Sequence, residues 1–181
     1  MDDDRWAVVT NRNLAVYLGA VLLFFAVLIT DRDGFVYLID GANLLFHEAG
    51  HVVFGFFGDT PGLYGGTLGQ LVFPVVVTIS FWRKGQPLSF AGGLVWFFEN
   101  FLNIARYMAD ARAQELPLVG GGDHDWANIF SRWDVLAQDT KIAGVFRTTG
   151  WLGMVIASAW VVWRWYRGRQ RTIPLDRLRS C

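Results

Sequence analysis

Cysteine, histidine and charge are all scarce in this sequence of 181 residues. The single cysteine, Cys181, excludes an internal disulfide framework. Charged residues make up 18% of the chain and cancel to a formal net charge of zero. Hydrophobic residues instead reach 53%, and the mean hydropathy of +0.30 lies at the upper edge for a soluble globular protein. The composition therefore favours an integral membrane protein, and the length suits one domain.

Five stretches are long and apolar enough to be membrane helices, which need about 20 mostly apolar residues. They are residues 13–30, 36–57, 63–82, 88–109 and 142–163. The first is long for the apolar part of a signal peptide and ends in charged residues instead of a small-residue cleavage site. The sequence therefore predicts an all-α fold, a single transmembrane domain of about five helices. It also predicts an extramembrane loop at 110–141 and a basic tail at 164–181.

Positive charge gathers near the C-terminus, where six arginines stand against a single aspartate. They are Arg164, Arg167, Arg169, Arg171, Arg177 and Arg179. Beside an apolar helix, such a tail is more typical of a cytoplasmic membrane flank than of a nucleic-acid-binding segment. We therefore expect a cytoplasmic C-terminus and no nucleic-acid partner. In a five-helix count, Arg83 and Lys84 fall on the same side, whereas the N-terminus and the 110–141 loop fall outside.

The strongest motif is His47-Glu48-Ala49-Gly50-His51, inside the second predicted span. Residues four apart lie on one face of a helix, one turn above each other, so both imidazoles can reach one metal ion. The glutamate beside the first histidine is then placed to take a proton from a metal-bound water, whose pKa zinc lowers to about 7. The motif predicts Zn²⁺ as the cofactor, with His47 and His51 as ligands and Glu48 as the catalytic base.

The depth of the motif in its span also favours a metal. His47 is about eleven residues into the span, or roughly 16 Å at 1.5 Å per residue, close to the middle of the bilayer. A charged residue there costs at least about 2.5–3.5 kcal/mol, so ionisable groups at this depth are functional by default. Haem is the weaker alternative, because two histidines on one helix face cannot bind opposite faces of one macrocycle.

A catalytic zinc needs a third protein ligand besides water. His124 is the only other histidine, and it follows a glycine run at 120–122 that leaves the loop free to fold back. Asp110, at the end of the fourth predicted span, is the second candidate. Asp123 and Asp125 can ligate the metal themselves or orient the histidine. The sequence favours His124, with Asp110, Asp123 and Asp125 as alternatives.

Small and polar residues after the motif are candidates for substrate binding. Gly65 and Gly66 precede Gln70 in the third predicted span. Small residues at this density are typical of close helix packing, but they also leave backbone free to pair with a substrate strand, with Gln70 as a polar partner. Asn103, in the fourth span, can hydrogen-bond a substrate backbone. Packing remains the alternative for the two glycines.

The chain resembles the site-2 protease class of membrane zinc metallopeptidases in three features: HExxH inside a membrane helix, Gly50 before the second histidine, and a glycine-bearing segment after it. The resemblance implies that His47 and His51 bind zinc and that Glu48 is the base. That class takes its third ligand from an aspartate in a Leu-Asp-Gly motif on a later helix. This sequence has no such motif, and Asp110 is the nearest analogue by position.

A second resemblance covers about residues 36–160. The order of residues 116–118 (Leu-Pro-Leu), a glycine run and residues 124–126 (His-Asp-Trp) is similar to a family of small bacterial membrane proteins. This resemblance implies that the chain lies in the bacterial inner (plasma) membrane.

We expect a membrane-embedded zinc metalloprotease, surrounded by the lipid bilayer, that hydrolyses peptide bonds of a membrane protein or peptide substrate. One alternative keeps the metal and changes the bond, as in a hydrolase of a lipid amide or ester. The other alternative is a non-enzymatic metal-binding sensor or scaffold. Glu48 favours an enzyme, because a structural zinc site does not need it, whereas a fourth protein ligand would favour a structural site.

Overall fold

The computed structural model describes residues 5–31, 35–119 and 123–171, and these residues are all-helical, as predicted. The elements are α1 (Asn11–Thr30), α2 (Tyr37–Gly55), α3 (Asp59–Arg83), α4 (Pro87–Ala109), α5 (Asp125–Arg132), the short 3-10 helix η2 (Leu136–Gln138) and α6 (Asp139–Arg171).

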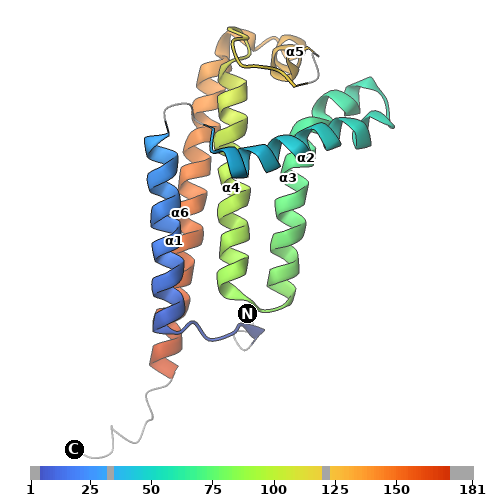
Figure 1. Ribbon diagram of the computed structural model, residues 1–181. Helices are drawn as coiled ribbons and strands as arrows, with labels where there is room; N and C mark the ends of the chain where they lie inside the picture. The colour runs from blue at the N-terminus through green and yellow to red at the C-terminus, as the bar shows by residue number, and fades with distance from the viewer. Residues whose placement is uncertain (1–4, 32–34, 120–122, 172–181) are drawn as a thin grey trace, which may run out of the picture.

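Four helical segments are long and apolar enough to cross a membrane, which indicates a membrane protein. They are α1, α3, α4 and the segment Leu136–Gln170 that contains most of α6. The motif-bearing α2 is not among them, and in Figure 1 it runs across the bundle instead of along it. The count of about five spans is therefore not confirmed within the part of the chain that the structure describes.

The arrangement of the helix ends bears on the expected orientation. The beginning of α1, the α3–α4 turn and the end of α6 lie at one end of the bundle, whereas α5 lies at the other end (Figure 1). Five spans would place the N-terminus opposite the C-terminus. In the structure the start of α1 and the end of α6 lie at the same end of the bundle, because α2 lies across the bundle and does not add a span.

The long helices pack through small residues, as is common in membrane bundles. Phe98 of α4 lies against Gly150 and Gly153 of α6, and a Cβ at Gly150 would approach the Phe98 carbonyl oxygen to 2.8 Å. A Cβ at Gly153 would overlap the Phe98 ring. Buried Val95 and Met154 continue the same contact between α4 and α6.

Glycines also bring α2 and α3 into backbone contact. α3 begins at Asp59, earlier than the predicted residue 63, after Gly58, whose φ of +117° is readily adopted only by glycine. A Cβ at Gly65 would lie 2.6 Å from the carbonyl oxygen of Gly50, and one at Gly69 would overlap the α2 backbone. This close packing holds the histidine face of α2 against the first half of α3.

The connection after α4 is folded instead of being an open loop. Its short helix α5 buries Trp126, Ile129 and Phe130 against the end of α4 and the start of α6. α6 begins at Asp139, before the predicted residue 142, and Arg112 donates to the Asp139 carboxylate at 2.8 Å. This apolar docking places the first turn of α5 over α2.

Candidate metal centre

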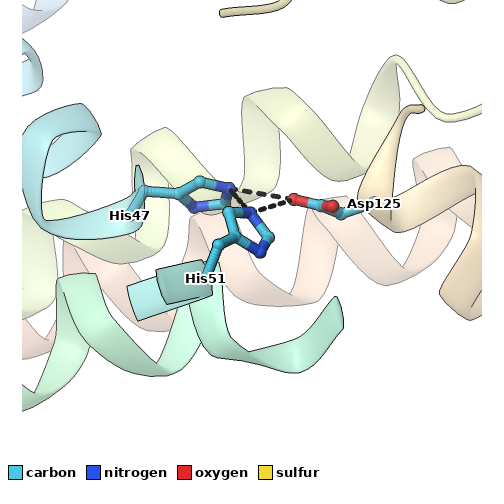
Figure 2. Close-up of side chains that lie close together, drawn as sticks. All are labelled: His47, His51 and Asp125. Carbon is cyan, nitrogen blue, oxygen red and sulfur yellow. Dashed lines mark hydrogen bonds and ion pairs between the residues drawn. The ribbon is translucent and has the colours of Figure 1, made fainter. Parts of the chain in front are cut away.

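Three side chains from two helices meet at one point (Figure 2). Nε2 of His47 and Nε2 of His51 lie 3.1 Å apart, and a single oxygen of Asp125, Oδ2, lies 2.9 Å from the first and 3.1 Å from the second. Two ligands of a tetrahedral zinc, each about 2.0–2.1 Å from the metal, lie roughly 3.4 Å apart. The triangle is therefore a few tenths of an ångström tighter than a zinc ligand set. Among the described residues, these three form the one group able to hold a metal ion.

The second nitrogen of each histidine ring has its own acceptor. Nδ1 of His47 lies 2.9 Å from Oε1 of Gln70, and Nδ1 of His51 lies 2.8 Å from the carbonyl oxygen of Gly62. Because a carbonyl can only accept, His51 carries a proton on Nδ1, and Nε2, which faces Asp125, is the atom where a metal would replace a proton. With Gln70 oriented as in the structure, the same holds for His47. Such outer partners fix the tautomer and ring orientation of metal ligands.

Asp125 reaches the histidines from the first turn of α5. The Tyr107 hydroxyl accepts a hydrogen bond from the Asp125 backbone N–H at 3.1 Å, which ties this turn to α4. Burial alone would raise the pKa of the Asp125 carboxyl, but its hydrogen bonds with His47 and His51 outweigh burial and lower the pKa to about 2. The carboxylate is therefore ionised at neutral pH, the form that binds a metal.

His124, the favoured third ligand, does not join this group, and Asp125 takes its place. His124 is the N-cap of α5, and its Nδ1 accepts from the Ala127 backbone N–H at 3.2 Å. Its Nε2 lies 3.4 Å from the Asp110 carboxylate. The ring is therefore engaged with its own helix and with the end of α4. The expected glycine hinge at 120–122 lies outside the described residues.

The two other alternative ligands also lie outside the group. Asp110 ends α4, and its carboxylate accepts the backbone N–H groups of Glu115 and Leu116 at 3.0 and 3.1 Å. It therefore orders the start of the α4–α5 connection and does not take the position that the site-2 resemblance implies. Asp123 is exposed and lines the cavity described below.

Glu48 and the three-residue group line one cavity of about 940 Å³. Its walls come from α2, the beginning of α3, the end of α4, residues 116–119 and α5. Glu48 is half-buried and is not part of the group of candidate ligands. A carboxylate that faces the same cavity as the ligands without being one of them matches the expected position of a catalytic base.

Gly66 leaves the space that the metal centre needs. A Cβ at this position would lie 2.5 Å from Nε2 of both His47 and His51. Two imidazole lone pairs and one carboxylate, converging beside an open glycine, are the donor types of a catalytic zinc site with three protein ligands. The residues present therefore fit zinc.

We expect Gly66→Ala to abolish metal binding, because the added methyl group would occupy the space in front of both ligand nitrogens. Gly41→Ala is the matched control, since a Cβ at Gly41 has no neighbour within 4 Å. Alanine is favoured over glycine in helices by about 1 kcal/mol, so neither change should weaken its helix. Metal analysis of the two purified variants tests this, and equal zinc content would contradict it.

The four expected substrate-binding residues have other contacts in the structure. Gly65 packs against Gly50, and Gly66 faces the metal-ligand nitrogens. Gln70 holds His47, and its amide donates to Oδ1 of Asn103 at 3.5 Å. Gln70 and Asn103 also line the large cavity. Their hydrogen bonds make them supports of the centre more than free partners for a substrate backbone.

Sequence reasoning missed the supporting residues Gly62 and Tyr107. Gly62 acts through its backbone carbonyl, which any residue could supply, so no sequence signal exists for it. Tyr107 lies in the predicted fourth span, and a tyrosine near a span end is typical of the membrane interface.

Comparisons of this chain with protein-family models, curated proteins and solved structures gave no match.

Proposed function

We propose that the chain is a membrane-embedded zinc metallopeptidase that hydrolyses peptide bonds. The observation that carries this proposal is the convergence of His47, His51 and Asp125 on one point, with Glu48 facing the same cavity. Two histidines and one carboxylate form the ligand set of several zinc peptidases, which keep a fourth position open for water or substrate. Among the described residues no fourth protein ligand closes the centre.

The protein groups divide the proposed chemistry among them. Zinc in such a site acts as a Lewis acid and lowers the pKa of a coordinated water to about 7. Glu48 accepts a proton from the attacking water and returns it to the leaving amine. Gln70 and Gly62 hold the two imidazole rings with their lone pairs towards the centre.

The cavity has room for a substrate at the upper end of the small-molecule size range. Its volume of about 940 Å³ lies near the top of the range of roughly 300–1,000 Å³ for small-molecule sites. Exposed apolar side chains at Leu118 and Val119 line it together with the polar Asn128 and Arg132. A mixed wall of this kind suits a polypeptide segment that carries both apolar side chains and backbone polar groups.

The proposed orientation follows from charge. Arginines lie over tryptophan rings at the end of the bundle where α1 begins and α6 ends, including Arg5 over Trp82 and Arg167 over Trp163, both at 4.7 Å. Aromatic and basic side chains together are typical of a membrane interface, and basic residues favour the cytoplasmic side. In this orientation the C-terminus is cytoplasmic and the metal centre lies towards the outer face of a bacterial inner membrane.

The test is metal analysis of the full chain purified in detergent. We expect about one zinc per chain, and loss of that zinc in the double variant His47→Ala/His51→Ala. Asp123→Asn is the control, because Asp123 lines the cavity without belonging to the ligand group. Full metal content in the double variant would refute the metal centre, and iron in place of zinc would point to oxygen chemistry instead of hydrolysis.

Activity then separates the peptidase from its alternatives. The zinc-loaded chain is incubated with a pool of fluorogenic peptides and, separately, with fluorescent lipid amides and esters in the same detergent. Cleavage of peptides alone supports the proposal. Cleavage of lipids alone would assign the centre to a lipid hydrolase, and a zinc-loaded chain that cleaves neither would favour a sensor or scaffold.

A further inference from the structure

A chain of buried and half-buried hydrogen bonds leads from the metal centre to a second acidic site. It begins at His47, passes through Gln70 and Asn103, and ends at Asp40, whose carboxylate accepts from the Asn103 side chain at 2.7 Å. Asp40 lies on α2, two turns before His47, and is 2% exposed. Its other carboxylate oxygen accepts the backbone N–H of Val36.

The chemistry of these groups gives the chain one direction. A metal on Nε2 of His47 requires the ring proton on Nδ1, which then donates to Oε1 of Gln70. The Gln70 amide nitrogen is therefore left to donate to Asn103, and the Asn103 amide nitrogen to donate to Asp40. Each donor in this series of hydrogen bonds points towards Asp40. The group at the Asp40 end must therefore be an acceptor.

A second branch of hydrogen bonds reaches Asp40 through Glu99. The Trp96 ring N–H donates to the Asn43 side-chain oxygen at 2.9 Å, and the Asn43 amide donates to Glu99 at 2.8 Å. The Glu99 and Asp40 carboxyl groups contact each other. Two facing carboxylates repel, so one of them holds a proton. Since Asp40 already accepts two hydrogen bonds, Glu99 is the group that donates.

Because these groups are buried, reversing the direction of a hydrogen bond in this network costs free energy. Asp40, Asn43, Gln70 and Glu99 are each at most 3% exposed. A buried polar group without its partner costs about 1–3 kcal/mol, and two donors facing each other also repel. Two positive side chains, Arg106 and Arg147, line a cavity of about 370 Å³ together with both carboxyls.

We propose that Asp40 is a positioning residue for the metal ligand His47, acting through Asn103 and Gln70. A carboxylate that accepts from a metal-bound histidine is a common outer partner, and here two amides relay the same effect over a longer path. The charge on Asp40 sets the direction of both amides, which places the His47 proton on Nδ1 and keeps Nε2 free. This inference rests on the metal centre proposed above.

Two isosteric substitutions separate polarity from shape. Asp40→Asn has one acceptor oxygen where the native residue has two, and the Val36 backbone N–H cannot reverse. The new amide therefore turns its NH₂ towards Asn103, which reverses both amides and drives the His47 proton towards Nε2. Glu99→Gln keeps a donor towards Asp40 and an acceptor towards Asn43, so it is the matched control.

Zinc affinity of the purified full chain is measured by competition with a chelating dye. We expect Asp40→Asn to lower the affinity about 10–100-fold, the usual loss for an outer partner of a metal ligand, and Glu99→Gln to stay close to the wild type. Should Asp40→Asn not fold, judged by its elution and helical circular dichroism, Asn103→Ala breaks the same path and is expected to give a similar loss. Equal affinities for all folded variants would overturn the inference.

A rescue experiment excludes a merely structural role for Asp40. In the Asp40→Asn background, Gln70→Glu places a carboxylate next to His47, where it accepts the Nδ1 proton whatever Asn103 does. Zinc affinity should then return towards the wild-type value, and failure of the rescue would overturn the inference. A wild-type chain that binds no zinc would instead refute the proposed function, so the two failures are distinguishable.

Discussion

Glu48→Gln should remove hydrolytic activity and leave the zinc in place. Glu48 faces the cavity beside His47 and His51 but is not one of the candidate ligands, so the metal centre does not depend on it. Glutamine has nearly the same shape and cannot accept a proton. General acid–base groups contribute about 10²–10⁴-fold to rate, and we expect a loss of kcat of this size. Cleavage of a fluorogenic peptide and zinc content are measured on the same preparation.

The control for this experiment is Glu115→Gln, a change of an exposed glutamate outside the cavity, which should keep both activity and zinc. The two readouts separate the possible roles of Glu48. Loss of zinc together with activity would place Glu48 among the ligands. Unchanged activity with zinc retained would exclude it as the base.

The part of the centre that sequence could predict is the part built by one helix. The spacing of His47 and His51 fixes their common face as soon as residues 37–55 are helical, and the structure brings their Nε2 atoms to 3.1 Å. The same local rule places Glu48 one residue on, towards the cavity. None of these positions depends on how the rest of the chain folds.

The third partner could not be chosen from sequence, because His124 and Asp125 are adjacent residues whose side chains contact different partners. The choice depends on where α5 begins. With His124 at the N-cap, its ring turns back to the Ala127 N–H, and Asp125 in the first turn faces the histidines. A helix start shifted by one residue would change which side chain points at α2.

The sequence also could not predict that α2 lies across the bundle. Hydropathy marks residues 36–57 as a weak span because Asp40, Asn43 and the two histidines interrupt the apolar run. Whether such a helix spans the membrane or crosses a bundle depends on its partners. Here Gly65 and Gly69 of α3 hold it by backbone contact, and Asn43 pairs with Glu99 of α4.

The sharpest test of the centre compares two neighbouring residues, each changed to asparagine. Asp125→Asn should lose zinc, because a neutral amide replaces the carboxylate whose Oδ2 contacts both histidines. The loss of affinity should exceed the roughly 10–100-fold that removal of an outer partner costs. His124→Asn should keep zinc, since asparagine is among the best N-cap residues and can still accept the Ala127 N–H.

Zinc affinity of both asparagine variants is measured by dye competition, with helical circular dichroism as the check on folding. The pair is informative because both changes leave a neutral amide in the first turn of α5 or at its cap, so general damage to this helix would affect both. Retention of zinc by Asp125→Asn together with its loss in His124→Asn would restore the histidine that the sequence favours. Loss in Asp125→Asn alone would establish that the connection between α4 and α6 completes the centre through an aspartate. In that case the site is formed only when α5 docks on α4 through Trp126, Ile129 and Phe130, so assembly of the centre and folding of this connection are one event.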